Sequence, residues 1–281
     1  MPLKKASEYA YLSARCHSVR AQLIDAETLK ALSASRSIGE FSAALSTTLH
    51  GSFITDISAE GIHKGLTASF EYQRKRLIHD MKKRHVEIFK LFFETKYTLL
   101  DEKTDNISIS GAQEIFHRID REYILKLEKS MHTLPSSEQR QIRKIVGSYF
   151  DLLNLYNLVK YRLLYRLSVE ETLSNMLPYA EKFTIPALHE LCAAKNLEEL
   201  SSHVKPVLGK GFNSYETFRQ VLYSYHIKQL LTVWSGYPFS LAIPFSLLRL
   251  MEIEINDLRA ITEGVAFDLG QKEIAAMLLG G

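Results

Sequence analysis

Two neighbouring carboxylates are the first feature of this sequence that could carry out chemistry. Glu252 and Glu254 lie two residues apart in the segment EIEIND, and paired carboxylates can shift each other's pKa values far enough for general acid–base catalysis. On a helix, however, residues two apart point in different directions. The spacing therefore favours separate structural or interface roles for the two glutamates.

A polar row in the segment DLLNLYNLVKYR is the second candidate. Asp151, Asn154 and Asn157 follow one another at intervals of three residues within an otherwise apolar stretch. They can therefore stay near one face of a helix and hydrogen-bond a neighbouring helix or its loop. Such a row can also be the solvated side of a helix, and Arg162 with the nearby tyrosines could anchor a partner. The residues alone leave these interpretations open.

Other signatures of ligand binding or catalysis are missing from the sequence. His79 and His85 lie six residues apart, which places them on different helical faces and predicts solvated side chains on a basic surface, not a metal site. The Gly-Lys-Gly run at 209–211 lacks the spacing of a phosphate-binding loop and predicts a turn. There is no GxSxG or HExxH motif. We therefore expect no cofactor, no bound metal and no catalytic activity.

Composition narrows the class of protein further. The chain has 281 residues, which predicts two or three packed units, and its 46% hydrophobic and 24% charged residues are typical of a globular protein. Lys and Arg exceed Asp and Glu only by 35 to 32, too little for a nucleic-acid-binding surface. Cys16 and Cys192 lie far apart and predict two buried thiols. The N-terminal segment has no apolar core typical of a secretory signal, so we expect a cytoplasmic location.

The elements that must position these residues are helices. Apolar residues recur at helical spacing almost throughout and strand signals are scarce, which predicts an all-α fold. The spacing predicts a first helix capped by Ser7, a long amphipathic helix over 59–97, either straight or bent, and a helix from Ser110 that ends at Pro135. A further helix follows toward Leu167, and shorter helices follow to the end of the chain.

An uncharged stretch, Leu230–Leu248, raises the question of a membrane span. A spanning helix must stay regular over about 20 residues, yet Gly236, Pro238 and Pro244 interrupt this one. We therefore predict the end of a buried helix, a turn, and a new helix that has Pro244 in its first turn.

Internal similarity is the most informative feature of the sequence. The segment LKALSASRSIGEFSAAL at 29–45 aligns without a gap with LHELCAAKNLEELSSHV at 188–204, and GQKEIAAML at 270–278 keeps part of the pattern. Each segment has a residue at the helix-cap position three before a Glu, as in a capping box. The similarity can be a coincidence of short capped helices, or it can mark a helical unit present two or three times.

Three segments together resemble the C subunit of the archaeal and bacterial A-type or V-type rotary ATPases, a relative of the d subunit of eukaryotic vacuolar ATPases. The start, YAYLSARCHSVRAQLIDAETLKALSASRSIGEFSAALSTT, is similar to the opening of that family, including Ala14 and Arg15. YFDLLNLYNLVKYRLL is similar to its middle motif, and PFSLLRLMEIEINDLRAI to its C-terminal signature. Two positions depart from the family pattern: Asp257 stands where Asn is usual, and Met251 stands where Lys is usual.

The resemblance implies an all-helical fold of three similar units about a pseudo-threefold axis, which form a funnel-like socket. We expect these units at 1–105, 106–205 and 206–281. It also implies a non-catalytic rotor subunit, present once per complex and peripheral to the membrane, which joins central-stalk subunits D and F to the membrane proteolipid ring. The candidate structural or interface residues are Arg15, Asp151, Asn154, Asn157, Arg162, Pro244, Glu252, Glu254, Leu258 and Arg259.

Three alternatives remain open from the sequence. The apolar stretch alone would fit an integral membrane protein. The all-α composition without catalytic motifs would fit a scaffold or regulatory protein unrelated to ATPases. An enzyme with a helical fold is the third alternative.

Overall fold

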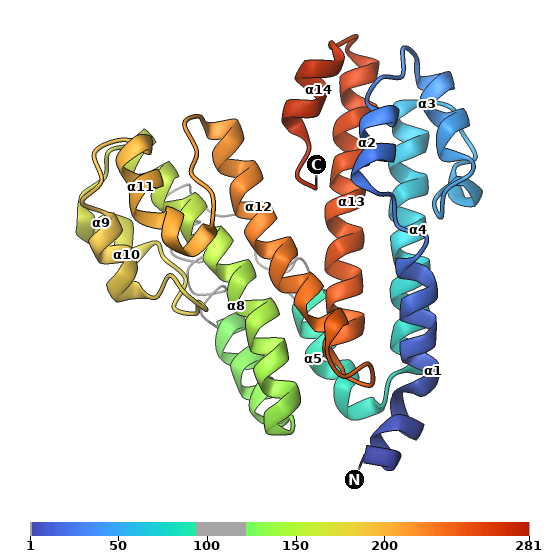
Figure 1. The fold of residues 1–281 in the computed structure, drawn as a ribbon, viewed down its shortest axis with the longest axis horizontal. Coiled ribbons are helices and arrows are strands. Elements are labelled where there is room, and N and C mark those ends of the chain that lie inside the picture. The colour runs from blue at the N-terminus through green and yellow to red at the C-terminus, as the bar shows by residue number, and fades with distance from the viewer. Residues whose placement is uncertain (1, 94–121, 281) are drawn as a thin grey trace, which may run out of the picture. The chain divides into compact units, whose positions relative to one another are not determined.

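The computed structural model describes residues 2–93 and 122–280, and the side chains of these residues except 2–8 and 84. All regular secondary structure within these ranges is helical (Figure 1), which confirms the predicted all-α class. The helices are α1 (Pro2–Arg20), α2 (Ala26–Leu32), α3 (Ile38–Leu45), η1 (Gly51–Phe53), α4 (Ala59–Asp80), α5 (Lys83–Phe93), α8 (Ser136–Leu158), η2 (Val159–Leu164), α9 (Val169–Ser174), α10 (Ile185–Leu191), α11 (Leu197–Leu208), α12 (Tyr215–Thr232), η3 (Val233–Ser235), α13 (Ala242–Ala266) and α14 (Gln271–Met277). Residues 122–132 are helical as well.

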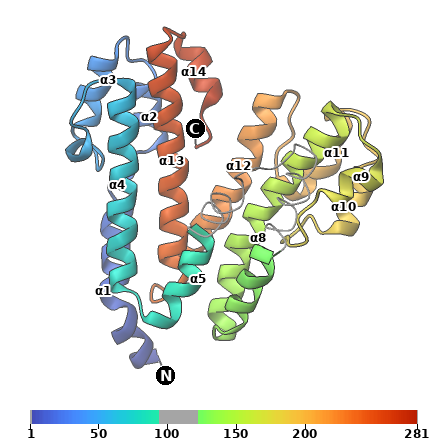
Figure 2. The same cartoon turned by 180° about the vertical axis from the view of Figure 1, so that it is seen from behind.

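The chain forms two compact units. The first unit combines both ends of the chain, residues 2–80 and 214–280, and the second unit comprises residues 81–213. In the first unit the long helices α4 and α13 lie side by side, as Figures 1 and 2 both show. The division into units at 1–105, 106–205 and 206–281, and the pseudo-threefold axis, stay predictions.

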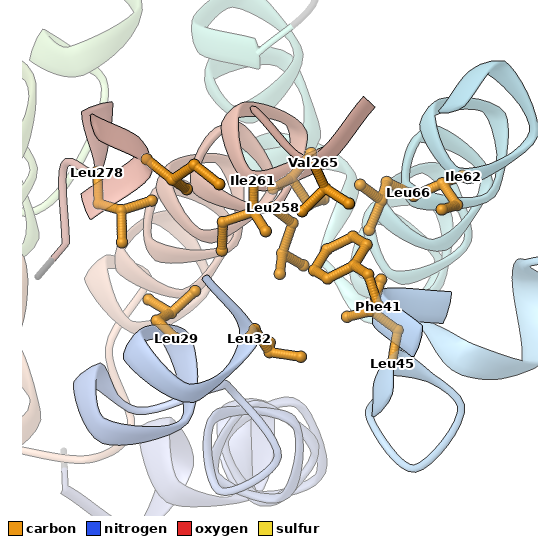
Figure 3. Packing of buried hydrophobic residues seen from close by; sticks show 12 residues of the cluster. Leu29, Leu32, Phe41, Leu45, Ile62, Leu66, Leu258, Ile261, Val265 and Leu278 are labelled. Atoms are coloured by element: carbon orange, nitrogen blue, oxygen red, sulfur yellow. The ribbon is translucent and has the colours of Figure 1, made fainter. Parts of the chain in front are cut away.

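A shared hydrophobic core explains why the two chain ends belong to one unit. Side chains from α2, α3, α4, α13 and the α14 region point toward one another in Figure 3. The buried members of this cluster are Leu29, Leu32, Phe41, Leu45, Ile62, Leu66, Ile255, Leu258, Ile261, Val265, Ile274 and Leu278. Because the cluster draws on both ends of the chain, neither end can bury its apolar side chains alone.

The predicted helix boundaries are partly confirmed. The first helix begins at Pro2, so the cap predicted at Ser7 is wrong. The long pattern over 59–97 is interrupted, because α4 ends at Asp80 and α5 begins at Lys83. The apolar periodicity does not reveal this break, because Met81 in the break is buried like its helical neighbours. The end of that pattern, past residue 93, lies outside the described residues.

The middle helices follow the prediction where they are described. The helix predicted from Ser110 is described only from residue 122, and it ends before Pro135 as expected. α8 begins at Ser136, directly after that proline, and continues as the π-helix η2 to Leu164. The predicted long helix toward Leu167 is therefore present, with a wider final turn.

The uncharged stretch Leu230–Leu248 has the predicted structure. α12 ends at Thr232, a short 3₁₀ turn follows, and α13 begins at Ala242 with Pro244 as its third residue. A proline is tolerated there because amides of the first turn lack an intrahelical partner. Residues 240–248 are all buried. Within the described ranges, none of the helices has the length and apolarity that a membrane span requires.

The prediction of buried thiols is confirmed, whereas the prediction for one histidine is wrong. Cys16 and Cys192 are both buried and free, and burial raises the pKa of the Cys16 thiol to about 12. His79 is exposed as expected. His85 is buried, because it lies three and four residues before Ile88 and Phe89, on the apolar face of α5, and not among the lysines that precede it.

The shared core leads to a first prediction. Ile274 of α14 is 1% exposed, and Ile274→Ala should destabilise the first unit by about 2–5 kcal/mol because it leaves a cavity between the chain ends. Lys272→Ala on the exposed side of the same helix is the matched control and should change stability by less than about 0.5 kcal/mol. Urea unfolding followed by Trp234 fluorescence measures both. Equal effects of the two variants would show that α14 does not belong to the core.

Candidate functional site in the long helices

Glu254, in the middle of α13, is the centre of a buried hydrogen-bond chain. Its Oε2 accepts the backbone amide of Ile24 at 2.7 Å, and its Oε1 lies 2.7 Å from His50 Nε2. His50 Nδ1 in turn lies 2.9 Å from Ser69 Oγ. An Nε2–H that donates to the carboxylate leaves Nδ1 to accept the serine hydroxyl. One side chain of α13 thus connects the loop before α2, the loop before η1 and α4.

The order Ser69–His50–Glu254 is that of a nucleophile, a base and an orienting carboxylate. His50 and Ser69 are fully buried, however, and Glu254 is 5% exposed. A catalytic serine must contact its substrate, and no substrate reaches a hydroxyl enclosed by the core. The hydrogen-bonded series Ser69–His50–Glu254 is therefore a structural cross-link. Its low-dielectric surroundings strengthen these hydrogen bonds, and the loss of any one partner destabilises the fold.

Asp257, nearly one helical turn after Glu254, holds the C-terminal segment. Its two carboxylate oxygens accept the amides of Leu279 at 2.6 Å and Gly280 at 2.9 Å. Burial raises the pKa of Asp257 to about 6, although these two hydrogen bonds and Arg219 act in the opposite direction. α13 therefore binds main-chain segments from both chain ends through two buried carboxylates.

The second unit has the same arrangement on α8. Asp151 Oδ1 accepts the amides of three consecutive residues: Glu181 at 3.0 Å, Lys182 at 3.1 Å and Phe183 at 2.9 Å. Asn154 forms a pair of hydrogen bonds with Leu177, accepting its amide at 2.8 Å and donating to its carbonyl at 3.1 Å. Both polar side chains are buried, so the hydrogen-bonding interpretation of the polar row holds for them. Asn157 is half-buried.

The hydrogen bonds of Glu254 and Asp151 also reach equivalent positions in the two units. Ile24 and Phe183 each stand directly before the N-cap residue of a short helix, α2 and α10 respectively. In both units, a buried carboxylate of a long helix therefore accepts the backbone amide of the residue just before the N-cap of a short helix. Glu254 matches Asp151 in this role, and Asp257, which binds Leu279, matches Asn154.

The two-helix elements that follow these amides are copies of each other. In α2–α3, Ser37 accepts the amide of Glu40 at 3.1 Å, and the Glu40 carboxylate accepts the amide before the cap at 2.9 Å. In α10–α11, Asn196 and Glu199 form the same two bonds, both at 2.9 Å. The aligned apolar positions are buried in both copies, namely Leu29 and Leu188, Leu32 and Leu191, Phe41 and Leu200, and Leu45 and Val204.

The third similar segment, at 270–278, corresponds to the start of α9 and not to the two-helix elements. α13 and η2 are each followed by a residue in the left-handed region, Asp268 (φ 55°) and Arg166 (φ 57°). A short helix follows each of them, and the amides of Gly270 and Ser168 donate to a glutamate three residues on, at 2.8 Å and 2.9 Å. Gly270 has no side chain, so only the glutamate half of the capping box exists there.

These contacts define one repeated unit: a long helix, a left-handed turn, a short capped helix, and the two-helix element. The second unit contains it in one piece, as α8–η2–α9–α10–α11. The first unit contains it in two pieces, α13–α14 from the C-terminal part and α2–α3 from the N-terminal part, joined by the bond from Ile24 to Glu254. Because the same hydrogen bonds occur in both units, the internal similarity marks a repeated helical unit and is not a coincidence of short capped helices.

The remaining predicted residues have separate environments. Arg162 donates from Nε to the Cys192 carbonyl at 3.0 Å and from Nη1 to the Leu167 carbonyl at 2.8 Å, so it links the end of η2 to the end of α10. Arg15 pairs with Asp80 at the end of α4.

On α13, Glu252 and Glu254 have different partners, as their spacing predicts. Glu252 pairs with Arg249 and is half-buried. Leu258 is a fully buried member of the core, and Arg259 donates to Thr67 Oγ1 on α4 at 2.7 Å. Pro244 is buried in the first turn. The structure thus joins Glu254, Leu258 and Arg259 to neighbouring elements of the first unit and does not gather the predicted residues into one pocket.

Sequence reasoning missed the partners of Glu254. His50 is 204 residues away from Glu254 in the chain, and Ser69 has no local signal of its role. The second copy of the capped helix, at 165–171, was missed because it shares only a Leu and a Glu with 267–273. The Asp257 position was identified only as a departure from a family pattern.

Comparison with known proteins identifies a family for most of the chain. The family described as ATP synthase (C/AC39) subunit matches residues 82–277. This range covers more than half of the chain and contains every predicted site residue except Arg15. No curated protein matches the sequence at a significant level. The likeness of residues 9–48 lies outside the matched range and stays a prediction.

The buried cross-link of α13 leads to a second prediction. Glu254→Ala should destabilise the first unit by about 3–5 kcal/mol, because it leaves the Ile24 amide and His50 buried without their acceptor. Glu252→Ala is the matched control, and it should cost less than about 1 kcal/mol because its ion pair is half-buried and near solvent. Urea unfolding at pH 7 measures the difference. Similar losses for both variants would contradict the role of Glu254.

A third prediction concerns pH. The pKa of Asp257 is raised from 3.8 to about 6 in the folded state, so its stabilising contribution is complete below pH 3.8 and is lost as the pH rises through 6. The advantage of wild type over Asp257→Asn in unfolding free energy should therefore fall by about 3 kcal/mol over this window. Urea unfolding between pH 3.5 and 7.5 measures it.

The control for this prediction has the opposite sign. Asp25, the exposed cap of α2, has a pKa lowered by its hydrogen bond from Thr28, so its contribution is lost as the pH falls. The unfolding free energy of Asp25→Asn should therefore still decrease between pH 4 and 6, as in wild type. If the unfolding free energy of Asp257→Asn decreases in the same way, a group other than Asp257 causes the pH dependence.

Proposed function

The chain belongs to the family of ATP synthase (C/AC39) subunits, and we propose that it is the non-catalytic rotor subunit that couples the central stalk to the membrane proteolipid ring. Its partners on one side are subunits D and F of the stalk, and on the other side the ring. The family match over residues 82–277 is the observation that carries this proposal. The match also removes the interpretation as a scaffold unrelated to ATPases.

The internal geometry supports a mechanical role. A coupler that transmits torque must resist relative movement of its helices, and its long helices are fixed by buried polar bonds in addition to apolar packing. Glu254 and Asp257 fix both chain ends to α13, and Asp151 and Asn154 fix two loops to α8. Buried hydrogen bonds to charged groups have strict distance and angle requirements, so they resist sliding better than apolar contacts alone.

The proposed location follows from the partners. The protein would lie on the cytoplasmic side of the membrane, peripheral to it, with one copy per complex. A single copy on a ring of many identical subunits meets a mismatch of symmetry. Its ring contacts should therefore be apolar and adaptable, because directional polar pairs cannot be satisfied at every step around the ring.

Binding of the two partners in separate experiments tests the proposal. The purified chain should be retained by an immobilised D–F pair, and in a second experiment by detergent-solubilised proteolipid ring. It should show no ATP hydrolysis without the catalytic subunits. Bovine serum albumin, a helical protein of no related function, controls for nonspecific retention. If the chain binds neither partner, or if the isolated chain hydrolyses ATP, the proposal is contradicted.

A further inference from the structure

A buried histidine and an arginine meet where α12 packs against α13 in the first unit. The two helices are joined by the turn that contains η3 (Figure 1). His226 of α12 is fully buried, and Arg249 of α13 donates from Nε to His226 Nε2 at 3.4 Å. An arginine side chain has donors and no acceptor, so His226 Nε2 must supply its lone pair. The contact therefore requires a neutral imidazole with its proton on Nδ1.

Arg249 dominates the electrostatics around His226. Among the described residues of the first unit, it is the charged side chain that acts on the histidine ring. Arg249 also pairs with Glu252 on its own helix, and η3 has no ionisable residue. A proton on His226 would therefore add a second positive charge beside Arg249. The other charged side chains on the elements that pack against α12 are bonded elsewhere or partly exposed, namely Glu254, Asp257, Arg259, Glu263, Lys272 and Glu273.

The second unit has an apolar residue at the position of the arginine. Glu254 of α13 corresponds to Asp151 of α8, so Arg249, five residues earlier, corresponds to Val146. Val146 is fully buried, which shows that an apolar side chain fills this position in the other copy of the long helix. The packing of the repeated unit therefore does not itself require an arginine here, and the contact with His226 adds a titratable group to one copy.

We propose that the contact between His226 and Arg249 is an acid-sensitive joint, which holds α12 against α13 at neutral pH and opens when His226 is protonated. Protonation removes the lone pair that accepts from Arg249 and places two positive charges next to each other in the core. Burial, and after it the charge of Arg249, lowers the pKa of His226 well below 6.5. When α12 separates from α13, the ring regains water and its ordinary pKa. The closed joint is therefore most stable above pH 6.5 and weakens as the pH falls.

Hydrogen exchange of α12 amides in the full chain tests this joint, and the test does not depend on the partners proposed above. If opening restores the ordinary pKa of His226, the opening equilibrium should increase about thirtyfold between pH 7.5 and 5.0. The protection factors of amides 225–230 should fall by the same factor, whereas those of amides 152–158 in α8 should change by less than about threefold.

Two variants identify the group responsible for the change. His226→Gln, which keeps an acceptor for Arg249, should lose the pH dependence of amides 225–230. His17→Gln is the matched control, because His17 is exposed and its ring centroid lies 5.1 Å from that of Trp234 at the end of the same hairpin. This control should keep the wild-type pH dependence. The titration of Asp257 cancels, since all chains are compared at the same pH values.

NMR of the imidazole nitrogens in the wild-type chain is a second measurement that does not depend on how the variants fold. At pH 7.5 the His226 ring should be neutral and carry its proton on Nδ1. A proton on Nε2 at this pH overturns the proposal. So does equal protection of wild-type amides 225–230 at both pH values, or a pH dependence that His226→Gln keeps or that His17→Gln loses.

Discussion

The hydrogen bond between a buried carboxylate of a long helix and the main-chain amide before a two-helix element is the interaction on which the rest of the structure depends. Glu254 forms it with Ile24, and Asp151 forms it with Phe183. A carboxylate removed from water is stable only with its hydrogen bonds in place. This requirement fixes where the two-helix elements begin, and so fixes the frame around which the apolar side chains pack.

The same interaction explains how the chain closes its first unit. The repeated unit is continuous in the second unit, whereas in the first unit its final part is supplied by the N-terminal part of the chain. The bond from Ile24 to Glu254 and the bonds from Leu279 and Gly280 to Asp257 bring both chain ends to α13. In the proposed rotor role, this closure would hold both terminal segments in place under torque.

Local features were predictable from the sequence, and distant ones were not. The caps at Ser37 and Asn196 and the helix that starts around Pro244 follow from residues within one or two turns. Glu254 was selected by its motif, but its bond to His50 joins positions 204 residues apart, and no local pattern reports such a pair. The polar row gave the correct bonds for Asp151 and Asn154 without identifying their loops. His85 was misjudged because charged neighbours in the sequence concealed its apolar helical face.

Hydrogen exchange of individual amides in the free chain measures the central claim most directly, since it reports whether the carboxylates hold both chain ends to the frame. The amides of Ile24 and Leu279 should exchange as slowly as those of Phe183 and Leu177, their counterparts in the second unit, because all four are bound by buried side chains of a long helix. Rapid exchange at Ile24 and Leu279, with protection kept at Phe183 and Leu177, would contradict the closure of the first unit.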